Sequence, residues 1–480
     1  MFPHIIGNDV SHHDLSNALS LALSASQTQS NILEDGDLFS KTKETHNMEL
    51  IQLDPNPSRD YESLNFRDAA QLSSHFQSSG FDAAYCHFPV EIYLIHQQDT
   101  WSSLNVSRDM ICILLDRYIL GPGFLHMLAC FRDRYLPTEE GFSGAPQTII
   151  SPGRSEFGWV YKYSEKKDVR FGNPWRIRHT GIYQVHDHVR GKSVLIIVSP
   201  SPTAHFTSYL RDTLRQSQFR SILLANPMVI HTMLISSHLY SWRGYLEYQE
   251  TLLIKLDMQS ACTALEDPLV SFDTLKEVRV IEKHILPIEQ ITNSFYMQLD
   301  GLQRAFEQFV KASDADQGLQ LPIRAAIEQF RSDATSYKNQ AMHIFKKTQS
   351  TAQSISDSLN LTYQQLAQSQ NRNTFMMATS ARDDSIAIRA ITLVTSFYLP
   401  FSFVATIFGM NLVDFDSQSR NLAVSNQMWL YFVISVPLTA VTLLCWRWRM
   451  RIYRQGYGME DMKSQDDTKS LRSNSDIEMV

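Results

Sequence analysis

The sequence predicts an α+β membrane protein with an N-terminal cytosolic α/β domain, a long stalk helix and two C-terminal transmembrane helices. Three observations predict this fold class. Two apolar runs lie near the C-terminus, over residues 386–408 and 428–446. Segment 323–399 contains neither glycine nor proline, as expected for a long helix. Residues 66–200 mix strand-like and helix-like patterns.

At 480 residues the chain is too long for a single hydrophobic core. Changes in composition divide it into eight segments. These are a disordered tail (1–60), a cytosolic α/β domain (61–200), a helical part of that domain (201–321), a stalk helix (322–385), a first transmembrane helix (386–411), an external loop (412–427), a second transmembrane helix (428–446) and a basic, then disordered, cytosolic tail (447–480).

Composition excludes several classes of function. A net charge of −7 with 19% charged residues predicts no nucleic-acid partner. Five cysteines without a CxxC pair are expected to be reduced and structural. Glycine-rich phosphate loops and the common hydrolase and metalloprotease motifs are absent from the sequence, so we expect neither an enzyme nor a bound cofactor.

The N-terminal segment 1–60 shows little hydrophobic periodicity, which predicts a disordered tail. The segment lacks the basic start and apolar core of a signal peptide. Its first arginine is Arg59, preceded by Glu34 and Asp35, whereas a mitochondrial presequence is rich in arginine and poor in acids. The sequence therefore favours the plasma membrane over the inner mitochondrial membrane. His12 and His13 fit a solvated tail better than a metal site.

The region from 66 to 200 carries the α/β pattern. Segment 89–96 is strand-like, 110–115 fits a strand or a buried helix, and 124–135 is helical. Strands at 175–188 and 193–199, joined by a turn at 190–192, predict a β-hairpin. His186 and His188 share one strand face and form a candidate metal pair. A third ligand at a recognisable spacing is missing, so an exposed strand end is favoured.

The chain is helical from about residue 201. Amphipathic runs cover 228–256 and 275–312, and an unbroken helix over 323–399 would be about 115 Å long. Apolar residues recur along it every three or four positions, which predicts a packing stripe against other helices or copies of the same helix. The stripe comprises Ile327, Phe330, Ala334, Tyr337, Ala341, Ile344, Ala352, Ile355, Leu359 and Leu366.

The two C-terminal apolar runs are long enough to cross a membrane. Segment 386–408 has Arg389 as its only charge, and segment 428–446 has no charge. A helix needs about 20 apolar residues to span the hydrocarbon core. Uncharged runs of this length are rare in soluble cores, so a membrane hairpin is preferred over two buried helices.

Charges at the ends of the hairpin predict its orientation. The loop carries Asp414 and Asp416 against Arg420. Positive residues favour the cytoplasmic side, so both termini are expected in the cytoplasm and the loop outside. The positive residues that flank the spans are Arg382, Arg389, Arg447, Arg449, Arg451 and Arg454.

Hydroxyl residues share one face of the first span with a few apolar residues. Such a stripe would be poorly placed against lipid, so it is expected to face water or another helix. Serine and threonine also bond to carbonyls of their own helix, and the stripe alone leaves pore lining and helix contact equally open. The hydroxyl residues are Ser385, Thr392, Thr395, Ser402 and Thr406.

The end of this span carries a family motif. Residues 398–411 read YLPFSFVATIFGMN, which resembles the signature of the CorA family of magnesium channels, including its fungal branch with the GMN motif. The resemblance implies a homopentamer with the first span around a pore and Gly409, Met410 and Asn411 as the selectivity filter. It also implies a pore face that comprises Ser385, Ile388, Ile391, Thr392, Thr395, Leu399, Ser402 and Thr406.

The chemistry of Asn411 agrees with that role. Mg²⁺ releases its water shell reluctantly, and a ring of amide oxygens accepts hydrogen bonds from the shell without removing it. A ring of carboxylates would hold the ion too tightly for conduction. Gly409 allows the backbone to turn out of the helix, and Asp414 and Asp416 are placed to concentrate cations at the mouth.

The sequence departs from the family in two ways. Acidic residues around the stalk form Mg²⁺ sensor sites in the better-known bacterial relatives, but segment 348–381 contains only Asp357 and Arg372 as charges. Asp383 and Asp384 are the nearest candidates for a regulatory metal site. Phe408 occupies the aromatic position of the motif where the family usually has tyrosine.

These features predict a pentameric channel that admits Mg²⁺, with the ion as transported species and as a candidate regulator. The expected partners are the lipid bilayer, further copies of the chain and divalent cations. Two alternatives remain open: a transporter of zinc or another divalent cation with the same fold, and a membrane-anchored regulatory protein that does not conduct.

Overall fold

A computed structural model provides the fold. It describes residues 30–42, 45–78, 88–136, 138–170, 172–261, 270–312, 317–407, 413–415, 422–424, 426, 428–449 and 451. The chain forms two compact units, Met1–Thr362 (unit 1) and Tyr363–Val480 (unit 2).

A seven-stranded mixed sheet lies at the centre of unit 1. Its strand order is β2-β1-β3-β7-β6-β5-β4, and β3 and β7 form its one parallel pair. The strands are β1 (Met48–Leu53), β2 (Glu62–Phe66), β3 (Val90–His96), β4 (Gln147–Ser151), β5 (Arg154–Lys166), β6 (Trp175–Asp187) and β7 (Lys192–Ser199).

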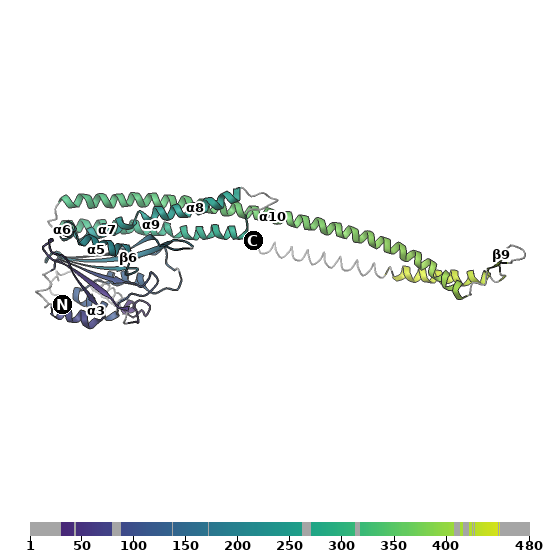
Figure 1. Cartoon of the computed structure of the whole chain (residues 1–480), viewed down its shortest axis with the longest axis horizontal. Helices are drawn as coiled ribbons and strands as arrows, with labels where there is room; N and C mark the ends of the chain where they lie inside the picture. Colours follow the sequence, from purple (N-terminus) through teal and green to yellow (C-terminus); the bar gives the residue numbers. More distant parts are fainter. Residues whose placement is uncertain are drawn as a thin grey trace, which may run out of the picture. The chain divides into compact units, whose positions relative to one another are not determined.

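Helices cover both faces of this sheet (Figure 1). Successive side chains of a strand point to opposite faces, so Ile92 and Leu94 enter one core and Tyr93 and Ile95 the other. One face is covered by α2 (Ala69–Ser78), α3 (Arg108–Tyr118), α4 (Pro122–Leu128) and η2 (Ala129–Phe131). The other is covered by α5 (His205–Leu214), α6 (Ser217–Ala225), α7 (Val229–His238), α8 (Ser241–Ala261), α9 (Phe272–Ala312) and the first part of α10 (Gln317–Ile407).

The predicted hairpin is confirmed as β6 and β7. Its turn is closed by the Asp187 carboxylate, which accepts hydrogen bonds from the backbone N–H groups of Val189 and Arg190, each at 3.0 Å. Gly191 has a φ of 63°, a conformation that glycine adopts without a steric penalty. Local turn chemistry therefore made this element predictable.

The prediction of a disordered tail up to Asp60 is wrong for β1, where every residue is buried. Its sequence, MELIQL, includes two polar residues, Glu49 and Gln52. Glu49 forms an ion pair with Arg211 at 2.6 Å, and the Gln52 amide donates to Glu91 at 2.9 Å. Both polar groups are satisfied by residues distant in the sequence, which is why β1 can be buried.

Segment 110–115, for which the sequence left a strand and a buried helix open, is helical and belongs to α3; the first turn of α3 is capped by the Ser107 hydroxyl, which accepts from the Met110 N–H at 3.3 Å. Two helix boundaries differ from the sequence predictions. The run predicted over 228–256 divides into α7 and α8. The helix predicted over 124–135 ends at Phe131, where η2 ends.

A buried ion pair joins the two parallel strands. Lys192 Nζ on β7 lies 3.1 Å from Glu91 Oε2 on β3, and both side chains are at most 6% exposed. The Tyr118 hydroxyl donates to the same carboxylate at 2.7 Å. Additional hydrogen bonds of this kind compensate for the loss of water around a buried charge.

Several histidines of unit 1 are buried in the neutral form. His231 Nδ1 accepts from Trp159 Nε1 at 2.8 Å, so its Nε2 carries the proton and donates to Gln184 Oε1 at 2.9 Å. Burial lowers the pKa of His231 to about 3. Burial likewise lowers the pKa of His96 and His238 to about 4.

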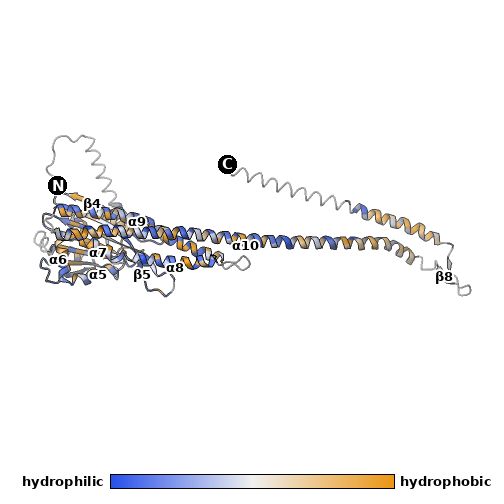
Figure 2. Cartoon of the chain, turned by 90° about the horizontal axis from the view of Figure 1, so that it is seen from above, coloured by the Kyte–Doolittle hydropathy of each residue, from blue (hydrophilic) through white to orange (hydrophobic). Residues whose placement is uncertain are grey.

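Unit 2 contains the rest of α10, a two-stranded ribbon of β8 (Val413–Phe415) and β9 (Leu422–Val424), and a C-terminal helix, Met428–Arg449. The colouring of Figure 2 changes from hydrophilic to hydrophobic along α10, and the C-terminal helix is hydrophobic. Both helices are long and apolar enough to cross a membrane. The predicted fold class is confirmed: an α/β domain, a long helix and two C-terminal apolar helices.

Candidate ion pathway

The helix α10 is anchored in unit 1 by the predicted packing stripe. Ile327, Ile344 and Ile355 are buried in the core shared with α8 and α9. Polar contacts add to this packing: Thr351 donates to Asp257 on α8 at 2.8 Å, and Arg331 pairs with Asp300 on α9 at 2.7 Å. The sequence left open whether the stripe meets other helices or copies of itself, and over this length it meets other helices.

Over residues 363–384 the helix has no packing partner among the described residues. Every side chain of residues 363–384 is exposed, including Leu366, Phe375 and Met377. A single helix in water is marginally stable, and its stability in proteins comes mainly from packing of one face. The exposed apolar residues therefore indicate that this part of α10 packs against a surface outside the described residues.

The residues of the predicted pore face all lie on α10. Ser385 and Thr392 are half-buried and the others are exposed. The apolar members are open to the surroundings, with Ile388 64% and Leu399 71% exposed. The structure thus brings these residues together on one helix face that the described part of the chain leaves largely uncovered.

The threonines of this face donate hydrogen bonds to their own helix. Thr392 Oγ1 lies 2.7 Å from the Ile388 carbonyl, Thr395 Oγ1 lies 3.0 Å from the Ile391 carbonyl, and Thr406 Oγ1 lies 2.8 Å from the Ser402 carbonyl. Their hydroxyl protons are satisfied within α10, so the oxygens remain as acceptors for water. The face presents acceptor oxygens, which suits the passage of a hydrated cation.

The opposite face of α10 contacts the C-terminal helix. Pro400 and Val404 are buried, and each is two positions, or about 200° of helix turn, from Ser402 on the pore face. The Tyr431 hydroxyl donates to the Phe401 carbonyl at 3.2 Å. We call this contact the helix seam; it comprises Pro400, Phe401, Val404, Tyr431, Ser435 and Thr439.

The helix seam was not predicted from the sequence. Ser435 is fully buried and Thr439 is 5% exposed, and these are the buried residues among those described in the C-terminal helix. Small residues four positions apart allow helix backbones to approach closely in membranes. That spacing is the sequence signal that could have indicated the seam.

The selectivity-filter residues Gly409, Met410 and Asn411 lie outside the described residues, as does Asp416. Asp414 lies on β8, in register with Ala423 of β9. The roles predicted for these residues remain predictions.

The predicted regulatory acids, Asp383 and Asp384, are exposed on α10. Within the described ranges, no three His, Cys, Asp or Glu side chains gather to hold a metal ion. The regulatory role of the two aspartates also remains a prediction.

The candidate pair at the end of β6, with His188 just beyond the strand, has hydrogen-bonding partners of its own. The rings of His186 and His188 are 4.6 Å apart, with His186 Nδ1 2.7 Å from Ser193 Oγ and His188 Nε2 3.1 Å from Ser155 Oγ. Burial lowers the pKa of His186 to about 4, with a smaller contribution from His188. His186 is 7% exposed, so the expectation of an exposed strand end is wrong at that residue.

Comparison with known proteins gives one family. The sequence matches a family model described as CorA-like transporters over residues 16–259, which is just over half of the chain. A search of curated proteins finds no match.

Two solved structures illustrate weaker similarities. The cytoplasmic domain of ZntB from Vibrio parahaemolyticus is 12% identical, with a TM-score of 0.39, over 66% of this chain and 99% of that one. Full-length CmaX is 13% identical, with a TM-score of 0.31, over 87% of this chain and all of that one.

Proposed function

This chain belongs to the CorA-like transporters, and from that premise we propose that it forms a homopentameric channel that admits Mg²⁺. One observation carries the proposal. The pore face of α10 lies opposite the helix seam, so the contact with its own C-terminal helix leaves the pore face uncovered. Five copies arranged around an axis would place these faces together around a water-filled path.

The filter at the outer end of the path would be formed by Asn411, within the GMN-containing branch of the family. Its amide oxygen accepts hydrogen bonds from the water shell that Mg²⁺ retains. Asp414 and Asp416 would raise the local cation concentration at the mouth, and Asp383 and Asp384 would bind a regulatory ion at the inner end.

The membrane potential would drive the influx. With both termini in the cytoplasm of a cell whose plasma membrane is negative inside, each charge gains about 2.3 kcal/mol per 100 mV on entry. A divalent ion gains twice that amount. This direction requires the arginine-rich end of the C-terminal helix to be cytoplasmic.

A flux assay tests the proposal. Purified full-length protein in liposomes, with a potential negative inside, is given Mg²⁺, Zn²⁺, Co²⁺ or Ni²⁺ in separate runs while an internal dye reports entry. We expect Mg²⁺ entry in the wild type and loss of entry in Asn411→Ala, because the substitution removes the amide ring without adding bulk. Asn411→Asp should bind Mg²⁺ more tightly and also lose flux.

The outcomes separate the alternatives. Preferential entry of Zn²⁺ would replace Mg²⁺ by zinc in the same architecture. Absence of flux for all four ions, in protein that is correctly inserted, would leave a membrane-anchored regulatory role. Wild-type uptake by Asn411→Ala would remove the filter role of Asn411.

The orientation is tested by thiol labelling. In a background with the five cysteines replaced by serine, a cysteine at Ser417 should react in intact cells with a reagent that does not cross membranes. A cysteine at Ser464 should react only after permeabilisation. Labelling of position 464 in intact cells would contradict cytoplasmic termini.

A further inference from the structure

A cavity of 590 Å³ lies in unit 1. Its walls come from β5, β6 and the loop that joins them, from the loops that follow β3 and η2, and from α8 and α9. Six basic side chains line it, against two carboxylates, Asp99 and Glu140. The basic residues are Arg134, Lys162, Lys167, Arg176, Arg178 and Lys283, and we call this site the basic cavity.

Only part of this charge is neutralised by neighbours in the described part of the chain. Arg178 pairs with Glu165 at 3.1 Å, and Arg134 pairs with Glu139 at 2.8 Å. The other four basic residues form no ion pair with a described carboxylate. An excess of positive charge therefore remains at the wall, and clefts of one sign concentrate ions of the other.

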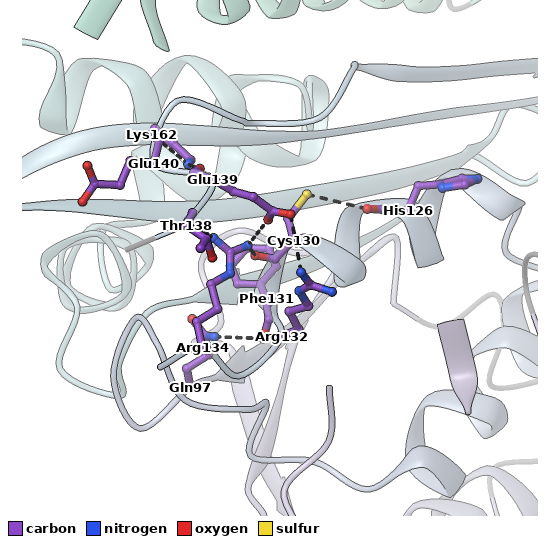
Figure 3. Close-up of polar contacts among 10 residues, drawn as sticks. All are labelled: Gln97, His126, Cys130, Phe131, Arg132, Arg134, Thr138, Glu139, Glu140 and Lys162. Atoms are coloured by element: carbon purple, nitrogen blue, oxygen red, sulfur yellow. Dashed lines mark hydrogen bonds and ion pairs between the residues drawn. The ribbon is translucent and has the colours of Figure 1, made fainter. Parts of the chain in front are cut away.

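Lys162 is the most deeply placed of the unpaired charges. It is 7% exposed, and its ammonium donates to the carbonyl oxygens of Glu139 at 2.6 Å and Glu140 at 2.7 Å (Figure 3). An ammonium has three donors, so two carbonyls leave one N–H for a further acceptor. Carbonyls carry no net charge, and a buried charge without a counter-ion is costly.

A second polar group at the wall also lacks a partner. His179 is 6% exposed, and its Nε2 has no hydrogen-bond partner among the described residues. Buried polar atoms without a partner are uncommon and call for a ligand or water at the site. The ring also hydrogen-bonds to the Cys130 backbone, so Nε2 is an acceptor, and the O–H of a hydrogen phosphate can donate to it.

The titration of neighbouring groups reflects the same positive potential. Burial and then the charges of Lys162, Arg134 and Arg178 lower the pKa of His179 well below its usual value. Burial lowers the pKa of Lys162 to about 8, with Arg134 as the next cause.

We propose that the basic cavity binds the phosphate groups of a small metabolite of nucleotide size. Its volume lies in the range of about 300–1,000 Å³ that is usual for ligand pockets. Arginine and lysine are the side chains that bind phosphate, the former through a planar pair of N–H groups. Trp101, which lines the cavity and is 44% exposed, offers an aromatic surface for a nucleobase.

Calorimetric titration of the purified full-length chain, without divalent cations and in chloride buffer, tests this proposal. Pyrophosphate supplies the phosphate charge alone, and ATP adds a base. We expect both to bind, and Lys283→Glu to weaken both at least tenfold. Arg176→Glu should act likewise. Lys311→Glu is the matched control, because it lies on the same helix about 42 Å away and makes the same change of charge.

Trp101→Ala distinguishes a nucleotide ligand from a ligand that is recognised by its phosphate groups alone. If it reduces ATP affinity to that of pyrophosphate, the ligand is a nucleotide; if ATP and pyrophosphate bind equally from the start, the phosphate groups alone are recognised. Failure of both to bind the wild type would overturn the proposal. Equal weakening by Lys283→Glu and Lys311→Glu would also overturn it. The assay measures binding without transport, so its result is independent of the channel proposal.

Discussion

Unit 1 buries charged side chains, whereas unit 2 exposes apolar ones. In unit 1, Glu91 and Lys192 lie at the beginning of the neighbouring strands β3 and β7, at most 6% exposed. In unit 2, Phe397, Leu399 and Trp429 are each about half exposed or more. Unit 1 also buries two large apolar cores, so only unit 2 departs from the distribution of polarity that is usual in water.

The difference shows which solvent each unit is built for. The buried charges Glu91 and Lys192 of unit 1 are paired and hydrogen-bonded, as a domain surrounded by water requires. The exposed apolar residues of unit 2 are stable in lipid, where helices associate through small residues and hydrogen bonds rather than by exclusion of water. Substitutions and changes of pH should therefore affect the two units differently.

Acidification should destabilise unit 1 alone. The folded pKa values of its buried histidines, about 3 to 4, lie below the unfolded value of 6.5. The contribution of these histidines to the free energy of unfolding is complete above pH 6.5. It is lost as the pH falls below that value, by up to about 1.4 kcal/mol per pH unit for each histidine. Amide exchange, corrected for intrinsic rates, should show reduced protection of β6 and β7 at pH 5.

The control for acidification lies within the same chain. Residues 363–480 contain no histidine. Exchange in the C-terminal helix should then be insensitive to pH in this range. Equal loss of protection in both units would show that another group controls acid stability.

Removal of one partner of the buried ion pair should have the next largest effect. Lys192→Met leaves Glu91 charged and unpaired, which should lower the free energy of unfolding by about 3–5 kcal/mol. Lys276→Met is the control, because its ion pair with Asp273 is exposed and such pairs contribute about 0–1 kcal/mol. Amide exchange of β3 and β7 in urea measures the free energy of unfolding of both variants. Similar losses in the two variants would contradict the difference expected between a buried and an exposed ion pair.

A larger residue at the helix seam should separate the two membrane helices. Ser435→Leu adds volume where the side chain is fully buried, which should cost about 1–3 kcal/mol. Val433→Leu, on an exposed part of the same helix, should change little. Protease resistance and melting temperature in detergent provide the measurement. Equal melting temperatures for Ser435→Leu and Val433→Leu would show that Ser435 is not part of the contact between the two helices.

The pore face should be sensitive to bulk that the opposite flank tolerates. Thr395→Trp should reduce Mg²⁺ flux at least tenfold while leaving assembly intact, because the indole would enter the path. Val394→Trp should retain most of the flux. Comparable effects at the two positions, measured in liposomes at equal protein content, would make the stripe a packing surface.

The membrane helices could be predicted because each depends on the polarity of consecutive residues alone. The hairpin of β6 and β7 was predictable for a similar reason, since Asp187 and Gly191 determine its turn locally. The candidate pore face came from 3-4 spacing together with the resemblance. In each case the deciding signal lies within one short, continuous stretch of the chain.

The elements that sequence patterns missed depend on distant partners. The polar residues of β1 are satisfied by Arg211 and Glu91, neither of which a local window includes. The basic cavity likewise gathers residues between Asp99 and His284. The helix seam needs two helices to be aligned before Ser435 is recognised as a contact.

The parallel pairing of β3 with β7 has a consequence for synthesis. Val90 pairs with Ser193, so the whole segment between them must be made before β3 has its parallel neighbour. The first span begins at Ile386, long after β7 ends at Ser199. At about 5–20 residues per second, a ribosome needs roughly 10–40 s to cover that distance. The strands of the sheet are therefore all available for pairing before the first membrane segment leaves the ribosome.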